Sequence, residues 1–514
     1  MTDEHGRILR LMRLEVRRDS DVPLRREERR LERWWEMAVR VLKGRATAVG
    51  LSHEQLRSWV ERSMLAKFPA GHRILSPGEA PALLSTLVSG YVKTIVAPAV
   101  YDPEGGDEAA GQRITVQFAS PGHVVGLVPT GPRNVRVKFG AVAHTDSVVM
   151  SIGRDAVCAI LDGTTAGARL LTLAYQCRLL SRLIYDKCRL LAADVRTRLE
   201  QELVRLARSC PREGSPGTIG MRFCHQDIAE LIGACRGSVT RAFGELVDQG
   251  LLTVRAGWYT VSPRLLAELS FRPSPHPSAR GYAVDETARR TLLESLSWMN
   301  DLGIPRDVIR MVADGAELRG YDVGSVIVGD GGVFATMLVS GVARIEAEVA
   351  SDGYLTAWFA KPGQFIGAGW AGRPDTQVFR AVVHDRCEVA FLRPDLMMKI
   401  TGMLSGSQFL RYLGYCHETL LQYLYHRCVM LPMETADRLL YQLHVLAAEF
   451  PEPVKDGTVI DLQLRPRRLL GSLVAANDRV LGRALAELKQ AERIRILPDG
   501  RILVVGYFAS RTAA

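Results

Sequence analysis

Two arginines, Arg236 and Arg241, stand five residues apart in a stretch with apolar residues at helical spacing, and Ser238 and Thr240 lie between them. A guanidinium group can donate two parallel hydrogen bonds to O6 and N7 of guanine, which discriminates between bases by about 1–3 kcal/mol. Hydroxyl groups bind phosphate or sugar, contacts that position a protein on DNA without specifying a base. This set of residues therefore predicts nucleic-acid recognition. The plain alternative is that each is a solvated residue of an ordinary helix.

The elements that must position these arginines are two short helices and a hairpin. Apolar residues on both sides of Gly233 predict a first helix over 225–232 and a second over 236–248. Gly250 closes the second helix, and the turn at 255–258 makes a wing. Two helices with a glycine between them are weak evidence alone, but here helix, turn, helix, glycine cap and wing follow in order. The second helix would lie in the major groove of DNA, and the first would cross the backbone.

The chain also repeats itself. The segment Thr86–Gly90 recurs as Met337–Gly341, and each follows alternating apolar residues punctuated by glycine, which predict β-hairpins. Farther along, Tyr185–Cys188 recurs as Tyr425–Cys428 inside long helical patterns. Two further matches lie between these in the same order, 121–126 with 362–367 and 141–144 with 381–384. Four ordered matches are hard to obtain by chance, so we expect two copies of one module, joined by a proline-rich linker.

Length and composition fit two such modules. A chain of 514 residues exceeds what one hydrophobic core supports, and 47% hydrophobic with 24% charged residues argues against global disorder. The net charge of +10 suits an anionic partner. The nine cysteines include no Cys-x-x-Cys pair, so no metal site, disulfide framework or cofactor is indicated. Because no apolar run of membrane-spanning length and no signal peptide occur, we expect a cytoplasmic protein without membrane contact.

The helix-turn-helix stretch resembles the Crp/Fnr family of bacterial regulators, which are related to the cyclic-AMP receptor protein. The likeness covers about residues 65–265, where the family's usual Arg-Glu-Thr-Val-x-Arg stands as Arg236-Gly237-Ser238-Val239-Thr240-Arg241. Both arginines are present, but the glutamate that would accept a hydrogen bond from cytosine is lost. The resemblance implies an α+β fold, in which a cyclic-nucleotide-binding-type β-roll is followed by a long dimerisation helix and a winged helix-turn-helix.

The second copy fits the family more loosely, from about residue 315 to 507. Asn477–Arg483 takes the place of the recognition helix, and 498–501 resembles the wing. Arg483 aligns with Arg241, whereas Asp478 replaces Arg236, so the second copy lacks one of the two base-reading arginines. The DNA-contacting residues expected across both copies are Arg236, Ser238, Thr240, Arg241, Gln226, Arg255, Arg467, Arg468, Arg479, Arg483 and Arg501, with Arg465 as a further phosphate ligand.

The repeat and the resemblance together predict the domain order. It is a charged N-terminal extension (1–50), a first β-roll (51–165), a first long helix (166–208), a first winged helix-turn-helix (209–268), a linker (269–284), a second β-roll (285–406), a second long helix (407–450) and a divergent second winged helix-turn-helix (451–514). The extension holds Trp34–Trp35 and is expected to be a solvated helix anchored on the body, or else an arm that docks on DNA or a partner. We expect the two long helices to pack on each other within one chain, because each carries an apolar stripe that must be buried.

Family members that bind cyclic AMP hold the ribose with a Gly-Glu step and pair the phosphate with an Arg-Ser or Arg-Thr step. Here the first step reads Gly126-Leu127 and Gly367-Ala368, and the second reads Val137-Lys138 and Gln377-Val378. Leaving those ligand groups unpaired costs several kcal/mol, so cyclic-AMP binding is not expected. The effector is unknown from the sequence.

Two other prosthetic groups of related regulators are disfavoured. An iron-sulfur cluster needs four cysteines, which cluster-binding relatives gather mostly near the N-terminus, and here the first is Cys158. The histidines of the first β-roll, His72, His123 and His144, are isolated, and such residues are more often structural than haem ligands.

Two functions remain open at this point. The first is a sequence-specific transcription regulator that binds double-stranded DNA as a monomeric pseudo-dimer, with RNA polymerase as a further partner and an asymmetric operator, because the two recognition helices differ. The second is a protein-interaction scaffold with degenerate sensor domains and residual DNA binding. The intact helix from Arg236 to Arg241 favours the first. An enzyme is not expected, since no nucleophile with its base, metal-ligand spacing or phosphate-binding loop emerges.

Overall fold

The computed structural model of the protein describes residues 36–43, 50–77, 83–96, 113–125, 138–268, 281–327, 333–350, 353–368, 378–464 and 467–507. The predictions for Trp34–Trp35, Gly126–Leu127, Val137, Gln377, Arg465 and most of the linker fall outside these residues.

The first β-roll consists of two antiparallel sheets flanked by helices. One sheet has the strand order β1-β7-β3 and the other β2-β6-β4-β5. The elements are α3 (His53–Glu61), β1 (Ser63–Phe68), β2 (Arg73–Leu75), β3 (Leu83–Ser89), β4 (Val92–Val96), β5 (Ile114–Ala119), β6 (Phe139–Ala143), β7 (Ser147–Gly153) and α4 (Arg154–Asp162). Gly90, between β3 and β4, has a φ of 86°, and a Cβ atom there would lie 2.4 Å from the backbone oxygen of Asp146. Gly341, its match in the repeat, has a φ of 80° and would place a Cβ atom 2.1 Å from the backbone oxygen of Arg386, so both positions require glycine.

Each predicted long helix is divided in two. In the first half, α5 (Ala166–Ala192) ends before Asp194, whose side chain caps α6 (Val195–Ser209) by accepting a hydrogen bond from the backbone N–H of Thr197. In the second half, Pro432 lies between α14 (Gly406–Met430) and α15 (Thr435–Glu449). The prediction of one continuous helix over 166–208 is therefore wrong, because the capping aspartate favours a new helix start. The second long helix, predicted over 407–450, is interrupted at Pro432, as a proline inside its pattern indicates.

The first winged helix-turn-helix has the helices that the sequence predicts. Its elements are β8 (Pro211–Arg212), β9 (Ser215–Ile219), α7 (His225–Ile232), α8 (Arg236–Asp248), β10 (Leu252–Arg255), β11 (Trp258–Val261) and α9 (Pro263–Glu268), with the sheet order β10-β11-β9-β8. The predicted ranges 225–232 and 236–248 are confirmed. Leu199 and Leu203 of α6 share one core with Ile228, Val239 and Leu246 of the two helices, so α6 packs with the winged helix.

The second half has a comparable order of elements around a different sheet. Among the described residues, four helices accompany its β-roll strands, and these strands form one seven-stranded sheet. The elements are β12 (Tyr282–Ala283), α10 (Glu286–Ser295), α11 (Trp298–Asp301), α12 (Arg306–Gly315), β13 (Glu317–Tyr321), β14 (Val326–Ile327), β15 (Ala335–Ala350), β16 (Gly353–Ala360), β17 (Phe365–Ala368), β18 (Phe379–Leu392) and α13 (Pro394–Met403) before α14. After α15 come β19 (Pro451–Val454), β20 (Gly457–Ile460), α16 (Arg467–Val474), α17 (Asp478–Gln490), β21 (Ile494–Ile496) and β22 (Ile502–Val505).

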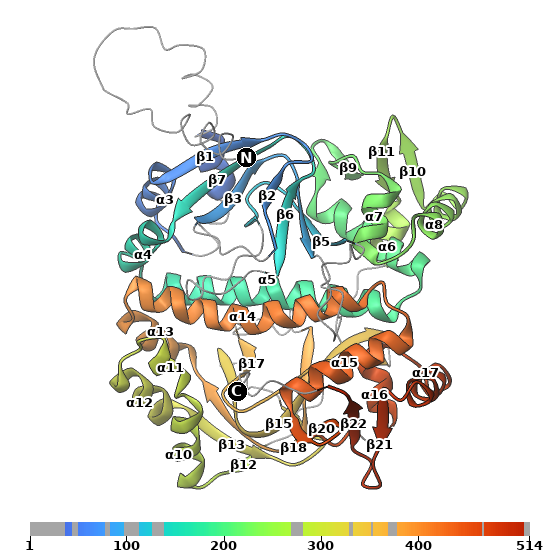
Figure 1. Ribbon diagram of the computed structural model, residues 1–514. Coiled ribbons are helices and arrows are strands. Elements are labelled where there is room, and N and C mark those ends of the chain that lie inside the picture. Colours follow the sequence, from blue (N-terminus) through green and yellow to red (C-terminus); the bar gives the residue numbers. More distant parts are fainter. Residues whose placement is uncertain are drawn as a thin grey trace.

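Helices α5 and α14 run side by side through the middle of the molecule (Figure 1). Near their starts, Leu170 of α5 shares a core with Leu410 of α14. Near their ends, Leu190 shares a core with Met430. The two helices are therefore parallel and in register, which confirms the prediction that they pack on each other within one chain.

The first winged helix rests on the C-terminal end of α14. Arg198 of α6 donates hydrogen bonds to the backbone oxygens of Ile232 at 3.1 Å and Leu431 at 3.4 Å. Gly233, which ends α7 with a φ of 64°, lies so close that a Cβ atom would be 2.6 Å from Cβ of Leu431. Ala475 follows α16 as Gly233 follows α7, and it has a φ of 56°. The left-handed backbone alone therefore does not exclude alanine at position 233, but the contact with Leu431 does.

Replacing Gly233 with alanine is expected to lower the free energy of unfolding by about 2–4 kcal/mol, because the methyl group adds an overlap with Leu431 to a left-handed backbone. Chemical denaturation of the full chain measures the change. Gly244→Ala is the control, since Gly244 lies within α8 with open space at its Cβ position, and this change should be neutral or stabilising. A Gly233→Ala variant as stable as the wild type would contradict the seating of α7 on Leu431.

Candidate nucleic-acid interface

Helix α8 turns one face to the core and the other to solvent. Val239, Phe243 and Leu246 are buried, whereas Arg236 and Arg241 are exposed. Both arginines lie in the first two turns of α8, on the side away from the core. The helix can therefore present two guanidinium groups to a major groove while its apolar face stays packed.

The hydroxyl groups between the arginines are engaged within the protein. The Oγ atom of Ser238 lies 3.1 Å from Sγ of Cys235. The Oγ1 atom of Thr240 donates to the backbone oxygen of Arg236 at 3.0 Å and lies 2.8 Å from Nδ1 of His225. The His225 ring in turn stacks on Phe243, with centroids 4.5 Å apart. These contacts connect the start of α7 with α8. Phosphate binding by the hydroxyl groups of Ser238 and Thr240 stays a prediction.

The wing carries a cluster of arginines around Trp258. The guanidinium carbons of Arg212 and Arg222 lie 4.2 Å and 5.2 Å from the centroid of the Trp258 ring. Arg255 is exposed at the end of β10, just before the wing turn. Sequence reasoning selected Arg255 and missed the other two, because they come from β8 and from the residues before α7. The sheet brings them to the wing, and the tryptophan is the one local signal of a stacking platform.

Helices α16 and α17, where the sequence predicts a second helix-turn-helix, have a basic face of their own. Arg467 and Arg468 are exposed at the start of α16, and Arg479 and Arg483 are exposed on α17. Because α17 begins at Asp478 and α8 begins at Arg236, Arg483 and Arg241 are both the sixth residue of their helices. The structure thus places an aspartate in the second half at the position where the first half has an arginine.

Two other predicted contacts are involved in bonds within the protein. Arg501 donates to Oδ2 of Asp499 at 2.7 Å and to a carboxylate oxygen of Glu452. A guanidinium group already paired with two carboxylates has little charge left for a phosphate, so Arg501 is not carried into the proposal below. Gln226 is exposed at the start of α7, and its amide donates to Glu230 at 3.5 Å.

A salt bridge joins the first β-roll to the first winged helix. Lys93 of β4 donates from Nζ to Asp227 and lies 3.3 Å from Oε2 of Glu230, and both carboxylates belong to α7. Burial alone would raise the pKa of the Asp227 carboxyl, but the hydrogen bonds from Lys93 and from the backbone of Cys224 hold that pKa below its ordinary value. Beside this pair, Nε2 of His144 lies 2.6 Å from the backbone oxygen of Arg222.

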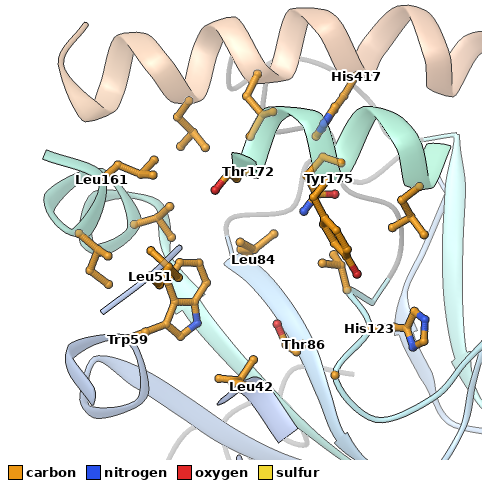
Figure 2. A pocket seen from close by; sticks show the side chains of 18 of the residues that line it. Leu42, Leu51, Trp59, Leu84, Thr86, His123, Leu161, Thr172, Tyr175 and His417 are labelled. Carbon is orange, nitrogen blue, oxygen red and sulfur yellow. The ribbon is translucent and has the colours of Figure 1, made fainter. Parts of the chain in front are cut away.

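An apolar cavity of about 190 Å³ lies between the first β-roll and the paired helices (Figure 2). Trp59 of α3, Leu84 of β3 and Tyr175 of α5 line it, and His417 contributes from α14. None of the described residues that line it is charged. Burial lowers the pKa of His417 to about 4, so its ring is neutral at pH 7. The cavity can accept a small, mainly apolar molecule with a polar group for the imidazole.

The matching place of the second half has a smaller cavity, of about 50 Å³, whose wall includes the aromatic rings of Trp358, Phe365 and Tyr415. Tyr412 and Tyr415 lie 240 residues after Thr172 and Tyr175 of the cavity wall. Trp298 stacks on Tyr415 with ring centroids 3.8 Å apart and lies 6.1 Å from Tyr412. The two halves therefore differ in their capacity for a ligand at this place.

In the first half, helices α7 and α8, the wing and the basic face of α8 form a winged helix-turn-helix. Residues 197–269 match the model of the Crp-like helix-turn-helix domain. The domain boundary thus falls inside α6, in agreement with the packing of that helix against α7 and α8.

Relatives of the chain are bacterial regulators. The global nitrogen regulator of Synechococcus elongatus is 28% identical over 200 residues, which are 38% of this chain and 85% of that protein. The CRP-like cAMP-activated global transcriptional regulator of Mycobacterium tuberculosis is 27% identical over 188 residues, 36% of this chain and 77% of that protein. The match with the structure of FixK2 from Bradyrhizobium japonicum covers 41% of this chain and 99% of that chain, at 21% identity and a TM-score of 0.34. The domain match and the sequence relatives support a role in DNA-binding transcription regulation.

Two further findings concern the described part of the chain. No helix there is long and apolar enough to cross a membrane. Its histidine, cysteine and acidic side chains form no group of three or more that could hold a metal ion.

The salt bridge of Lys93 yields a prediction about acid stability. In the wild type, the lowered pKa of Asp227 stabilises the fold above the unfolded-state pKa of about 3.9, and this contribution is lost as the pH falls through the folded-state value. Lys93→Met should cost about 1–3 kcal/mol at pH 7, because it leaves two partly buried carboxylates without their cation. It should also move acid unfolding to a higher pH, since the pKa of Asp227 rises relative to the wild type when the hydrogen bond and the charge of Lys93 are removed.

Denaturation at pH 7 and at pH 4 measures both effects. Lys67→Met, a change of the same kind at an exposed residue of β1, is the control and should leave both values unchanged. If Lys93→Met had the same acid transition as the wild type, the carboxylates of α7 would not depend on Lys93.

Proposed function

We propose that the protein is a sequence-specific, DNA-binding transcription regulator, which acts as a single-chain pseudo-dimer on an asymmetric operator and is not controlled by the cyclic-AMP binding of the family. The observation that carries the proposal is the exposed face of α8, with Arg236 and Arg241, inside a Crp-like helix-turn-helix domain. Double-stranded DNA is the proposed ligand, and RNA polymerase is the proposed protein partner.

The placement of the two recognition helices supports action as a pseudo-dimer. Helices α8 and α17 lie at the same end of the paired α5 and α14 (Figure 1). A symmetric dimer reads two equal half-sites about one helical turn apart with identical helices. Here the helices begin with Arg236 and Asp478, so the two half-sites should differ in sequence.

The basic residues divide into two proposed roles. Arg236 and Arg241 contact bases, because they lie exposed at the start of α8. The other proposed contacts hold phosphates and position the protein. They are Gln226, Ser238, Thr240 and Arg255, together with Arg212 and Arg222 of the first wing, and Arg467, Arg468, Arg479 and Arg483 of the second half.

The lining of the cavity supports independence from cyclic AMP. Among its described residues there is no arginine to pair with a phosphate and no carboxylate to bind a ribose. In the second half, Gly367 at β17 is followed by Ala368 instead of a glutamate. A bound cyclic nucleotide would leave its charged and polar groups without partners.

Arg241→Ala is expected to weaken binding to the selected operator by about 1–3 kcal/mol and to relax specificity in the half-site that α8 reads. Arg483→Ala should cost less and act evenly across sequences, because an arginine without a base-reading neighbour contributes mainly charge. Binding-site selection with the full chain, followed by footprinting and affinity measurements at fixed salt, tests both variants. Both side chains are exposed, so each variant should stay folded. Equal losses of affinity and of sequence preference would contradict an asymmetric operator.

Cyclic AMP is expected not to bind at physiological concentrations. Isothermal titration of the full chain with the nucleotide should show no saturable heat. A dissociation constant in the micromolar range would overturn this part of the proposal and leave the DNA-binding part intact.

A further inference from the structure

The apolar cavity of the first half, with a volume of about 190 Å³, is large enough for a small molecule. Cavities of about 150 Å³ that are lined by aliphatic and aromatic side chains stay dry and bind benzene. In proportion, this cavity can hold about eight non-hydrogen atoms. A molecule with a single ring is of this size, and it would gain van der Waals contacts with the lining on all sides.

The lining of the cavity selects against charged molecules. Leu51, Leu84 and Leu161 are among its apolar side chains, and none of its described residues is charged. Burial lowers the pKa of His417 to about 4, so its ring supplies no positive charge at pH 7. A carboxylate in the cavity would lose its hydration without gaining a cation as a partner, which is unfavourable. The cavity therefore suits an uncharged molecule.

One polar atom of the lining lacks a hydrogen bond. Nε2 of His417 is buried and has no partner in the described part of the chain, and the residue as a whole is 5% exposed. By contrast, Oγ1 of Thr172, another lining residue, donates to the backbone oxygen of Ala168 at 2.9 Å. Figure 2 shows the His417 ring directed from α14 toward the cavity. A buried polar atom without a partner is costly and requires an explanation, and a hydroxyl group of a ligand would provide one.

The smaller cavity of the second half lacks both of these properties. Each cavity takes one residue from the paired helix of the opposite half, His417 of α14 in the first and Cys177 of α5 in the second. These residues are 240 positions apart, which is the spacing of the repeat. The second cavity, of about 50 Å³, is too small for a ring, and a thiol is a weak hydrogen-bonding group. We therefore expect one ligand per chain, in the first half.

We infer that the apolar cavity is a binding site for a small uncharged molecule with one ring and one hydroxyl group, which forms a hydrogen bond with Nε2 of His417. A hydroxyl group suits this atom in either tautomer of the imidazole, because it can donate a hydrogen bond or accept one. Such a ligand would contact α3, the first β-roll, α5 and α14 at once, and would thus join the first β-roll to a helix of the second half. This binding site goes beyond the proposed DNA binding and does not depend on it.

Isothermal titration of the full chain without DNA, at pH 7, tests the site with para-cresol, a phenol that matches the cavity in size. We expect saturable binding of one equivalent, with a dissociation constant of about 1 mM or lower. Benzoate, a carboxylate of similar size, should not bind in this range, because the described lining offers no cation.

Thr172→Phe should weaken the binding of para-cresol by about tenfold or more, because the added ring fills the cavity. Its matched control is Thr291→Phe on α10. Oγ1 of Thr291 also donates to a backbone oxygen four residues earlier, that of Thr287 at 3.1 Å, but this residue does not line the cavity. Para-cresol should raise the unfolding midpoint of the wild type and of the control, and leave that of Thr172→Phe unchanged.

His417→Leu tests the hydrogen bond separately from the volume. It should weaken the binding of para-cresol by about three- to tenfold, the share of one hydrogen bond, and leave the binding of toluene unchanged, since toluene has no hydroxyl group. The fold should tolerate this change, because leucine replaces a buried side chain that has an unpartnered atom with an apolar one.

No saturable binding of para-cresol by the wild type at millimolar concentration would overturn the proposal. So would undiminished binding by Thr172→Phe, which would place the ligand elsewhere, or binding of benzoate as tight as that of para-cresol. The same change in affinity for para-cresol and for toluene in His417→Leu would contradict the hydrogen bond to the imidazole. Because no DNA is present in these titrations, their failure would leave the proposed DNA binding unaffected.

Discussion

The pairing of α5 with α14 is the interaction on which the rest of the structure depends. Each helix has an apolar stripe, and the two stripes bury each other from Leu170 and Leu410 at one end to Leu190 and Met430 at the other. The β-rolls pack on the outer sides of this pair, and the winged helices follow its C-terminal end (Figure 1). Where the pairing would leave backbone carbonyl groups without a hydrogen bond, polar side chains donate to them. Arg169 of α5, which is 4% exposed, donates to the backbone oxygen of Thr401 at 2.8 Å, in the second half of the chain.

A buried basic side chain on each paired helix connects strands of the β-roll to the helices that follow. Lys187 of α5 donates to the backbone oxygens of Thr115 at 3.4 Å and Leu231 at 3.1 Å. Arg427, 240 residues later, donates in the same way to Ala357 at 2.6 Å and Leu473 at 3.1 Å. In each half one acceptor belongs to the sheet and the other to the first helix of the helix-turn-helix. A shift of the helix relative to the sheet would thus disturb the winged helix as well, because a buried donor group that loses its acceptor costs free energy.

How far the sequence predicts this structure depends on whether the determining contacts are local. The helix-turn-helix was predictable because Gly233, the two helix patterns and the wing turn lie within one short stretch. The break after α5 has a local signal as well, the capping side chain of Asp194, but a strong leucine pattern on both sides obscures it. The apolar cavity had no local signal, because its lining comes from α3, the first β-roll, α5 and α14, which are far apart in the sequence.

The covalent link between the halves has a consequence for how the helix pair behaves in a cell. Two separate subunits dissociate on dilution and exchange partners with every similar chain nearby, by mass action. Two helices of one polypeptide find each other at a concentration set by the tether, whatever the number of molecules. A symmetric interface must also match a copy of itself, so each substitution appears twice. In this chain a substitution appears once, which leaves α5 free to keep Thr172 and Cys177 while α14 has Tyr412 and His417 at the matching places.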